Sequence, residues 1–267
     1  MGRGMAEIGE GLKEVAIIGL GNMGGAIAKN LARRGYEIHG YDPVEMKMPK
    51  HVTLYSSLNE LLAKQIPAVI AVKPSLVKEV VGQLPDNRLI ISIAAGITTE
   101  QLNSFRKSSG PVIRVMPNTP FQIGEGVSAL FADSSVGEGE KAYALELFQT
   151  GGDAFYIDSE SKMHAVTALS GSGPAFVSLF MQAMEDAGVY LGLSRELSRK
   201  MAAKTIAGTG RLIEKSGRSP QELIQEVTSP GGTTIYGIHT LKDFSMERAV
   251  QRAIRKAADR SMELGGK

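Results

Sequence analysis

The stretch VAIIGLGNMGGAIAKNLARRG, residues 15–35, contains the pattern that decides the fold. It begins with a short run of Val, Ala and Ile residues, which is typical of a buried strand. Glycines follow at Gly19, Gly21 and Gly24, and an amphipathic segment continues to Gly35. Glycine adopts backbone conformations that other residues avoid, so this spacing marks a tight turn. The stretch therefore predicts a strand, a tight turn and a helix in succession.

The spacing is the G-x-G-x-x-G fingerprint of dinucleotide-binding proteins, in the structural context that the fingerprint requires. Gly19 would permit the turn, Gly21 the close approach of a pyrophosphate, and Gly24 the packing of helix on strand. The helix N-terminus offers free N–H groups to phosphates. We therefore expect a dinucleotide site, and a glycine-rich turn without a ligand is the alternative. Its residues are Gly19, Leu20, Gly21, Asn22, Met23 and Gly24.

Short apolar runs continue beyond this stretch and alternate with amphipathic segments. They are rich in Val and Ile and bounded by Gly, Pro or Asp, as strands are. The runs are residues 15–19, 36–42, 67–72, 88–95, 111–116, 126–132 and 154–158. Two intervening segments begin with a capping box, Ser57 with Glu60 and Thr98 with Gln101. Strands that alternate with helices need crossover connections, which predicts an α/β fold with a Rossmann-type, doubly wound, mainly parallel sheet.

The pattern changes after Asp158, where Val-rich runs give way to Ala, Met and Leu at helical spacing. The segment AFVSLFMQAMEDAG, residues 175–188, is apolar around much of its circumference, which a surface helix would not be. We predict a flexible extension at residues 1–12, a dinucleotide-binding domain at 13–158 and an all-α domain at 159–267.

The composition excludes several classes of protein. The chain has 267 residues, and 30 basic and 28 acidic side chains give a net charge of +2, so we expect no nucleic-acid or membrane partner. No cysteine is present, which excludes disulfides and thiolate chemistry. Residues 1–14 lack the apolar run of a signal peptide, so we expect a cytoplasmic protein. The histidines show no metal-ligand spacing, and we expect no metal site; they are His39, His51, His164 and His239.

The ends of four predicted strands add candidates for the cofactor site, since doubly wound sheets bind ligands at the carboxyl ends of their strands. Asp42 ends the second run, where an acidic residue would accept ribose hydroxyls; turn formation before Pro43 is its alternative role. Lys73 is equally well explained as a solvated turn residue. The small residues Ala94, Ala95 and Gly96 would let the backbone approach a flat nicotinamide ring. The remaining candidates are Ala71, Val72, Lys73, Pro74, Ala94, Ala95, Gly96 and Asn118.

TSPGGTT, residues 228–234, is uncharged and has no large side chain, although helical segments surround it. A Gly-Gly turn presents backbone N–H groups as a nest for an anion, and the flanking hydroxyls add further donors. The segment predicts a site for a small polar ligand, and a simple connection between helices is the alternative.

Read in order, these motifs resemble the pyrroline-5-carboxylate reductase family. The matching segments are GLGNMG, AVKP, SIAAGI, RVMPNTP, TALSGSGPAF and VTSPGGTTIYGIHTL, and the resemblance as a whole covers nearly all of residues 13–265. The resemblance implies hydride transfer from NAD(P)H to the C=N carbon of 1-pyrroline-5-carboxylate, the last step of proline biosynthesis. It also implies that the helical domain binds substrate and forms a homodimer, which can assemble into a larger oligomer of dimers.

The resemblance assigns roles within TSPGGTT. The SPGG loop would hold the carboxylate of a cyclic imino acid, and a threonine hydroxyl would face the ring nitrogen. These roles fall on Ser229, Gly231, Gly232 and Thr233 for binding, and on Thr234 for binding and catalysis. Near the position of Asp42, many members carry small hydroxyl residues, which suit the 2′-phosphate of NADPH. A carboxylate at Asp42 would repel that phosphate, so here we expect use of NADH as well as NADPH.

Two other classes of protein share parts of the pattern. The 3-hydroxyacid dehydrogenases begin with GLGxMG and carry a catalytic lysine after a glycine-rich turn, whereas GSG at residues 171–173 is followed by PAFVSLF. A non-catalytic nucleotide sensor would have no reason to keep a second ligand loop such as TSPGGTT.

Overall fold

The computed structural model describes residues 13–44, 48–84 and 87–265, and the extension predicted at residues 1–12 lies outside this part of the chain. The chain forms two compact units. The first contains the described residues up to Ser172 together with those from Ala257 onward, and the second is Gly173–Lys256.

This division differs from the predicted boundary after Asp158. Residues 159–172 belong to the first unit because Met163 and Ala168 are buried there, in segments that contact the sheet. The return of the chain end to the first unit left no signal in the local pattern.

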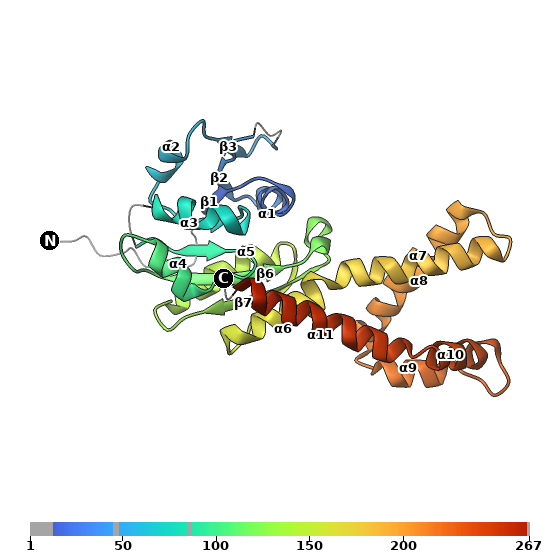
Figure 1. Ribbon diagram of the computed structural model, residues 1–267. Helices are drawn as coiled ribbons and strands as arrows, with labels where there is room; N and C mark the ends of the chain where they lie inside the picture. Colours follow the sequence, from blue (N-terminus) through green and yellow to red (C-terminus); the bar gives the residue numbers. More distant parts are fainter. Residues whose placement is uncertain (1–12, 45–47, 85–86, 266–267) are drawn as a thin grey trace. The chain divides into compact units, whose positions relative to one another are not determined.

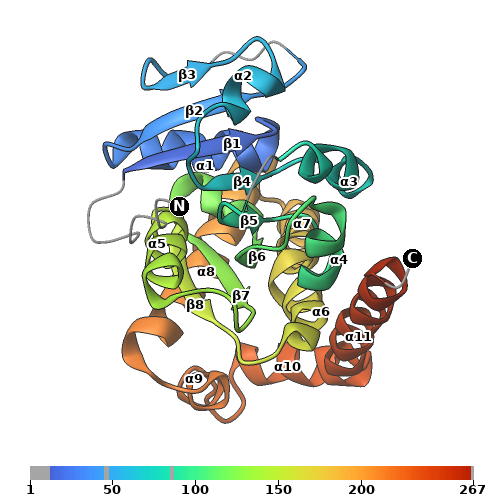
Figure 2. The same cartoon turned by 90° about the vertical axis from the view of Figure 1, so that its left-hand side faces the viewer.

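Within the described residues, the first unit is built on an eight-stranded sheet of order β3-β2-β1-β4-β5-β6-β7-β8 (Figures 1 and 2). The strands are β1 (Glu14–Ile18), β2 (Glu37–Tyr41), β3 (Val52–Leu54), β4 (Ala68–Ile70), β5 (Ile90–Ser92), β6 (Val112–Pro117), β7 (Gly126–Ala132) and β8 (Gly152–Tyr156). All neighbouring strands are parallel except β6 and β7. The doubly wound, mainly parallel sheet is confirmed.

Each of the seven predicted runs overlaps a strand, and β3 was missed. Only three residues long, β3 lies at the edge of the sheet, and Thr53 and Leu54 are exposed. A short, exposed edge strand lacks both the apolar run and the alternation by which a strand is recognised.

Helices cover both faces of the sheet, and Figure 2 shows α5 on one side and α3 and α4 on the other. Along β1, Val15 and Ile17 pack in the core that includes α1 and α5, while Ala16 and Ile18 pack in the core that includes α2, α3 and α4. A strand buried on both faces reads as a continuous apolar run. The helices are α1 (Asn22–Arg33), α2 (Leu58–Leu62), α3 (Pro74–Gly82), α4 (Thr99–Phe105), the 3-10 helix η1 (Thr119–Ile123) and α5 (Glu138–Gln149).

One of the two predicted capping boxes is complete. The Thr98 hydroxyl accepts from the Gln101 N–H at 3.1 Å, and the Gln101 side chain accepts from the Thr98 N–H at 2.9 Å. The Ser57 hydroxyl accepts from the Glu60 N–H at 3.3 Å, but the Glu60 carboxylate bonds the hydroxyl of Ser56. The reciprocal bond predicted for Ser57 is therefore replaced by a contact with its neighbour.

The second unit is helical, as predicted. It contains α7 (Gly173–Tyr190), α8 (Arg195–Ser216), α9 (Pro220–Glu226), α10 (Thr233–Asp243) and the first part of α11 (Met246–Gly265). The buried Glu185 of α7 forms ion pairs with Arg195 at 3.0 Å and Arg199 at 2.9 Å, which join α7 to α8 (Figure 1). Among the described helices, none is both long and apolar enough to cross a bilayer.

Candidate active site

The glycine turn between β1 and α1 requires glycine at two positions. Gly19 has a φ of +94°, and a Cβ on it would lie 2.7 Å from the carbonyl oxygen of Ala71. A Cβ on Gly24 would lie 1.9 Å from the carbonyl oxygen of Gly19. Both contacts are with backbone, which has no room to move, so these glycines serve the fold itself.

Gly21 is different, because a Cβ there would meet no atom of the protein within 4 Å. It is exposed, and its φ of −61° suits any residue. Gly21 caps α1 without a side chain, so the N–H groups of the first turn are left to water or a ligand. This open space beside a helix N-terminus fits a pyrophosphate.

Backbone hydrogen bonds bring the predicted cofactor loops to one edge of the sheet. The Gly19 N–H donates to the Tyr41 carbonyl at 2.8 Å, and the Ala71 N–H donates to the Ile18 carbonyl at 2.8 Å. The ends of β2, β1 and β4 are thereby aligned. Since β5 and β6 run in the same direction, the loops that begin at Ile93 and Asn118 lie at this edge as well.

Asp42 contacts the glycine turn directly. Its Oδ2 accepts from the Leu20 N–H at 2.7 Å, and its Oδ1 accepts from the Val44 N–H at 2.9 Å. Each carboxylate oxygen keeps a second lone pair, so Asp42 serves the turn and can still accept another hydrogen bond. A hollow lies beside it, and none of the described residues that line it is basic. Its lining is Leu20, Asp42, Pro43, Val44, Leu54, Tyr55 and Ser56.

The loop after β5 presents little side-chain bulk, whereas the loop after β4 carries a lysine. Lys73 is exposed and caps α3, and Pro74 occupies the first position of that helix. Gly96 has a φ of +80°, a conformation that glycine adopts readily. After β6, the Asn118 Oδ1 accepts from the Val127 N–H at 3.0 Å, so this side chain also joins the start of β7 to the loop.

TSPGGTT lies in the second unit, in the connection from α9 to α10. Gly231 has a φ of +70°, and a Cβ on Gly232 would lie 2.4 Å from the Ser229 hydroxyl. The Gly232 N–H donates to the Ser229 carbonyl at 3.1 Å, which closes the turn. Thr233 and the half-buried Thr234 begin α10. The segment is a tight turn that leads into a helix N-terminus.

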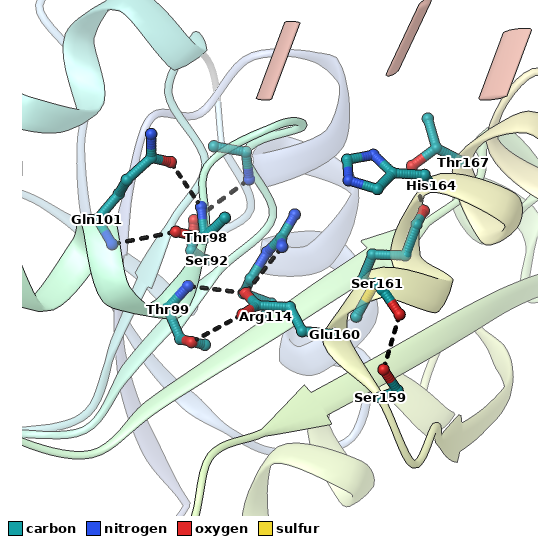
Figure 3. A network of polar contacts seen from close by, with 12 residues as sticks. Ser92, Thr98, Thr99, Gln101, Arg114, Ser159, Glu160, Ser161, His164 and Thr167 are labelled. Carbon is teal, nitrogen blue, oxygen red and sulfur yellow. Dashed lines mark hydrogen bonds and ion pairs between the residues drawn. The ribbon is translucent and has the colours of Figure 1, made fainter. Parts of the chain in front are cut away.

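A polar network that the sequence interpretation missed is centred on Glu160 (Figure 3). Glu160, from the 3-10 helix η2 (Glu160–Lys162), bonds Thr99 of α4 and Arg114 of β6. The signal was present, because an arginine inside the apolar run PVIRVM needs a buried partner of opposite charge. Nothing in the spacing pointed to Glu160 as that partner.

His164 lies close to this network, in the short helix α6 (Met163–Val166). Its Nδ1 is 3.0 Å from the Ser261 hydroxyl of α11. Burial lowers the pKa of His164 below its usual range, and the positive charge of Arg114 lowers it further, while Glu160 acts in the opposite direction.

His39 belongs to a separate cluster near the amino ends of β1 and β2, away from the glycine turn at the carboxyl ends. Its Nε2 lies 2.8 Å from the Glu14 carboxylate and 3.5 Å from that of Glu37. Three potential metal ligands therefore meet here, although the pattern of histidines indicated none. The Lys64 ammonium lies 3.3 Å from the same Glu14 oxygen, so the cluster already contains a cation.

The parallel strand order, the glycine turn and the acidic end of β2 define a Rossmann-type dinucleotide-binding protein. The model of the family described as pyrroline-5-carboxylate reductase dimerisation matches residues 160–264. A second model, described as NADP oxidoreductase coenzyme F420-dependent, matches residues 14–96.

Relatives match over most of the chain. Pyrroline-5-carboxylate reductase from Pseudomonas aeruginosa is 37% identical over 94% of this chain and 96% of its own. The Arabidopsis thaliana enzyme of that name is 39% identical over 80% of this chain and 78% of its own. The crystal structure of Plasmodium falciparum pyrroline carboxylate reductase with NADP bound matches with a TM-score of 0.88 over 96% of this chain and 99% of that one. The two sequences are 32% identical. The chain belongs to the pyrroline-5-carboxylate reductase family.

Proposed function

We propose that the protein reduces 1-pyrroline-5-carboxylate to L-proline with NAD(P)H. The observation that carries this proposal is the presence of two sites in a chain of this family. One is the glycine turn with open space at Gly21, and the other is the TSPGGTT turn at the start of α10. Family membership favours this reaction over that of a 3-hydroxyacid dehydrogenase or a nucleotide sensor.

The protein's own part in this reaction is to bind and orient two rings. Bound NAD(P)H would supply the hydride, so no further catalytic group of high reactivity is needed. The backbone N–H groups at Gly231 and Gly232 would hold the substrate carboxylate, with Ser229 and Thr233 as neighbouring donors. The Thr234 hydroxyl would bond the ring nitrogen as the imine becomes an amine.

The assay is oxidation of NADPH and NADH by the purified protein with 1-pyrroline-5-carboxylate, with proline identified as the product. A panel of 3-hydroxyacids with the oxidised cofactors is the comparison. We expect turnover with the cyclic imine only. Turnover of a 3-hydroxyacid, or binding of cofactor without any turnover, would select one of the two alternative classes.

We further propose that Asp42 allows efficient use of NADH. A carboxylate beside the adenosine ribose accepts its hydroxyls and repels a 2′-phosphate. At an effective dielectric constant near 20 this repulsion would amount to about 2–4 kcal/mol at contact distances, and solvent would reduce it. The hollow beside Asp42 has no basic residue in its described lining to offset the repulsion.

Asp42→Ser should shift the ratio of kcat/KM toward NADPH, chiefly through KM for the cofactor. Wild-type protein should use NADH at least as well as NADPH. Asp42→Asn is the matched second variant. It also removes the charge, but it keeps one oxygen for the backbone N–H groups of Leu20 and Val44 and so disturbs the turn less. A wild type that prefers NADPH tenfold or more, or an unchanged ratio in both variants, would leave Asp42 only its role in the turn.

We also propose a homodimer formed through the helical unit, which can assemble further into an oligomer of dimers. Several large apolar side chains of α7 are exposed in the single chain, among them Val177 at 48%, Leu179 at 69% and Phe180 at 40%. Met181 and Met184 are half-buried beside them. Exposed apolar area of this kind marks an interface.

Phe180→Asp should convert the dimer to monomer at micromolar concentration and lower the melting temperature, because a carboxylate would be buried in the interface. Light scattering measures the mass. Phe155→Asp on β8 is the control: Phe155 is 48% exposed and lies outside residues 160–264. A wild type that is monomeric and active under these conditions would contradict the proposal.

A further inference from the structure

A partly buried ion pair is joined to the start of α4 (Figure 3). Arg114 is 4% exposed and donates to Glu160 Oε1 at 2.8 Å. The same oxygen accepts from the Thr99 N–H at 2.7 Å, and Oε2 accepts from the Thr99 hydroxyl at 3.0 Å. Both oxygens of one carboxylate therefore hold a single residue of α4.

Thr99 is the first residue of α4, and the segment between β5 and Thr99 contains Ala94, Ala95 and Gly96. At the strand end, the Ile93 N–H donates to the Ile70 carbonyl at 3.1 Å, which attaches the segment to the sheet. At the helix end, the attachment is the Glu160 carboxylate. Because the segment is short, these two attachments restrict the backbone between them.

The end of α11 restricts the same segment from another direction. A Cβ on Gly96 would lie 3.4 Å from the Gly265 nitrogen, and one on Gly265 would lie 3.0 Å from the Gly96 carbonyl oxygen. The hydrogen bond of His164 with Ser261 joins this part of α11 to α6, the helix that follows Glu160. The segment has little space in which to shift toward α11.

We infer that Glu160, paired with Arg114, is a positioning residue that acts through Thr99 to fix the backbone of residues 94–96 for hydride transfer. The inference rests on the proposed function and on the sequence-based expectation that this backbone borders the nicotinamide ring. Charge-assisted hydrogen bonds to a carboxylate are strong, and the buried Arg114 needs an anionic partner, which the partly exposed Glu160 supplies. Reaction rates fall steeply when reacting rings are misplaced by an ångström or less.

The first measurement is hydrogen–deuterium exchange of the protein without cofactor. Thr99→Val removes the hydroxyl and keeps the ion pair, so amides of residues 94–99 should exchange about tenfold faster, the effect expected for loss of one good hydrogen bond. Thr99→Ser restores the hydroxyl and should exchange as the wild type does. Glu160→Gln would leave the Arg114 charge unpaired, so the Thr99 variants are the better test.

The second measurement separates positioning from binding. In Thr99→Val, kcat should fall about five- to fiftyfold, while the Kd for NADPH changes less than about threefold. The kinetic isotope effect on kcat with NADPH deuterated at C4 should rise, because the hydride step becomes more limiting. If Thr99 had a purely structural role, Thr99→Val would not lower kcat and raise the isotope effect while leaving the Kd for NADPH nearly unchanged.

Glu140→Gln is the matched control. Glu140 is a buried carboxylate that accepts from the Gly137 N–H at 2.8 Å at the start of α5. Because β7 runs antiparallel to β6, α5 begins at the opposite edge of the sheet, and this variant should leave exchange at residues 94–99 and kcat unchanged. Exchange or kcat unaffected by Thr99→Val overturns the inference. A wild type without turnover would overturn the proposed function instead, and the exchange difference would still decide whether Glu160 fixes the segment.

Discussion

Replacement of Thr234 by alanine is expected to lower kcat/KM for 1-pyrroline-5-carboxylate by roughly ten- to a thousandfold, the range for one hydrogen bond made in the transition state. The hydroxyl lies in the first turn of α10, next to a turn that carries no charge. As the imine is reduced its nitrogen gains electron density and a proton, so a hydrogen bond to it matters more in the transition state than in the bound substrate.

Steady-state kinetics with cofactor and substrate varied separately measure this effect. Thr234→Ser should retain most of the activity because it keeps the hydroxyl. Thr233→Ala is the comparison within the same turn: Thr233 is exposed and is proposed only as a neighbouring donor to the carboxylate, so it should matter much less to kcat. Wild-type turnover in Thr234→Ala, with cofactor affinity unchanged, would remove Thr234 from the mechanism.

The glycines of the turn should separate into two classes by their alanine variants. Gly24→Ala places a Cβ 1.9 Å from the Gly19 carbonyl oxygen, so the turn must open. We expect a loss on the order of 3 kcal/mol in the free energy of unfolding and a melting temperature lower by roughly 6–12 °C. Calorimetry of the protein without cofactor measures both.

Gly21→Ala should fold with a melting temperature within about 2 °C of the wild type, because its Cβ meets no atom of the protein. The methyl group would instead occupy the space proposed for the pyrophosphate, and the Kd for NAD(P)H should rise at least about tenfold. Unchanged cofactor affinity in a well-folded Gly21→Ala protein would contradict the proposed placement of the cofactor.

Much of the first unit was predictable because its signals are local. The strand, glycine turn and helix of residues 15–35 each depend on residues within a few positions of one another, and the structure contains all three. Local signals also predicted the complete capping box at Thr98. In the second unit they predicted the apolar helix at residues 175–188, observed as α7. The carboxyl ends of the parallel strands then bring the candidate cofactor loops together.

Other features depended on residues that are distant in the chain. Glu160 meets Thr99 across 61 positions and Arg114 across 46, and Ser261 meets His164 across 97. The carboxylate of Asp42 reaches back 22 positions to the Leu20 N–H, which gives it a role in the turn in addition to the one predicted for the cofactor. Such pairs leave no periodic pattern, because neither partner constrains its own neighbours in the chain.

The sequence by itself therefore determined the class of fold, the glycine turn, the helical second half and the family. Each of these is written in spacing, in runs of one residue type or in motifs of consecutive residues. Only the tertiary structure decided that residues 159–172 pack with the first unit, that β3 extends the sheet, and that the buried Arg114 pairs with Glu160. The physical reason is that burial and charge pairing depend on which distant segments come into contact, and local propensity does not specify those contacts.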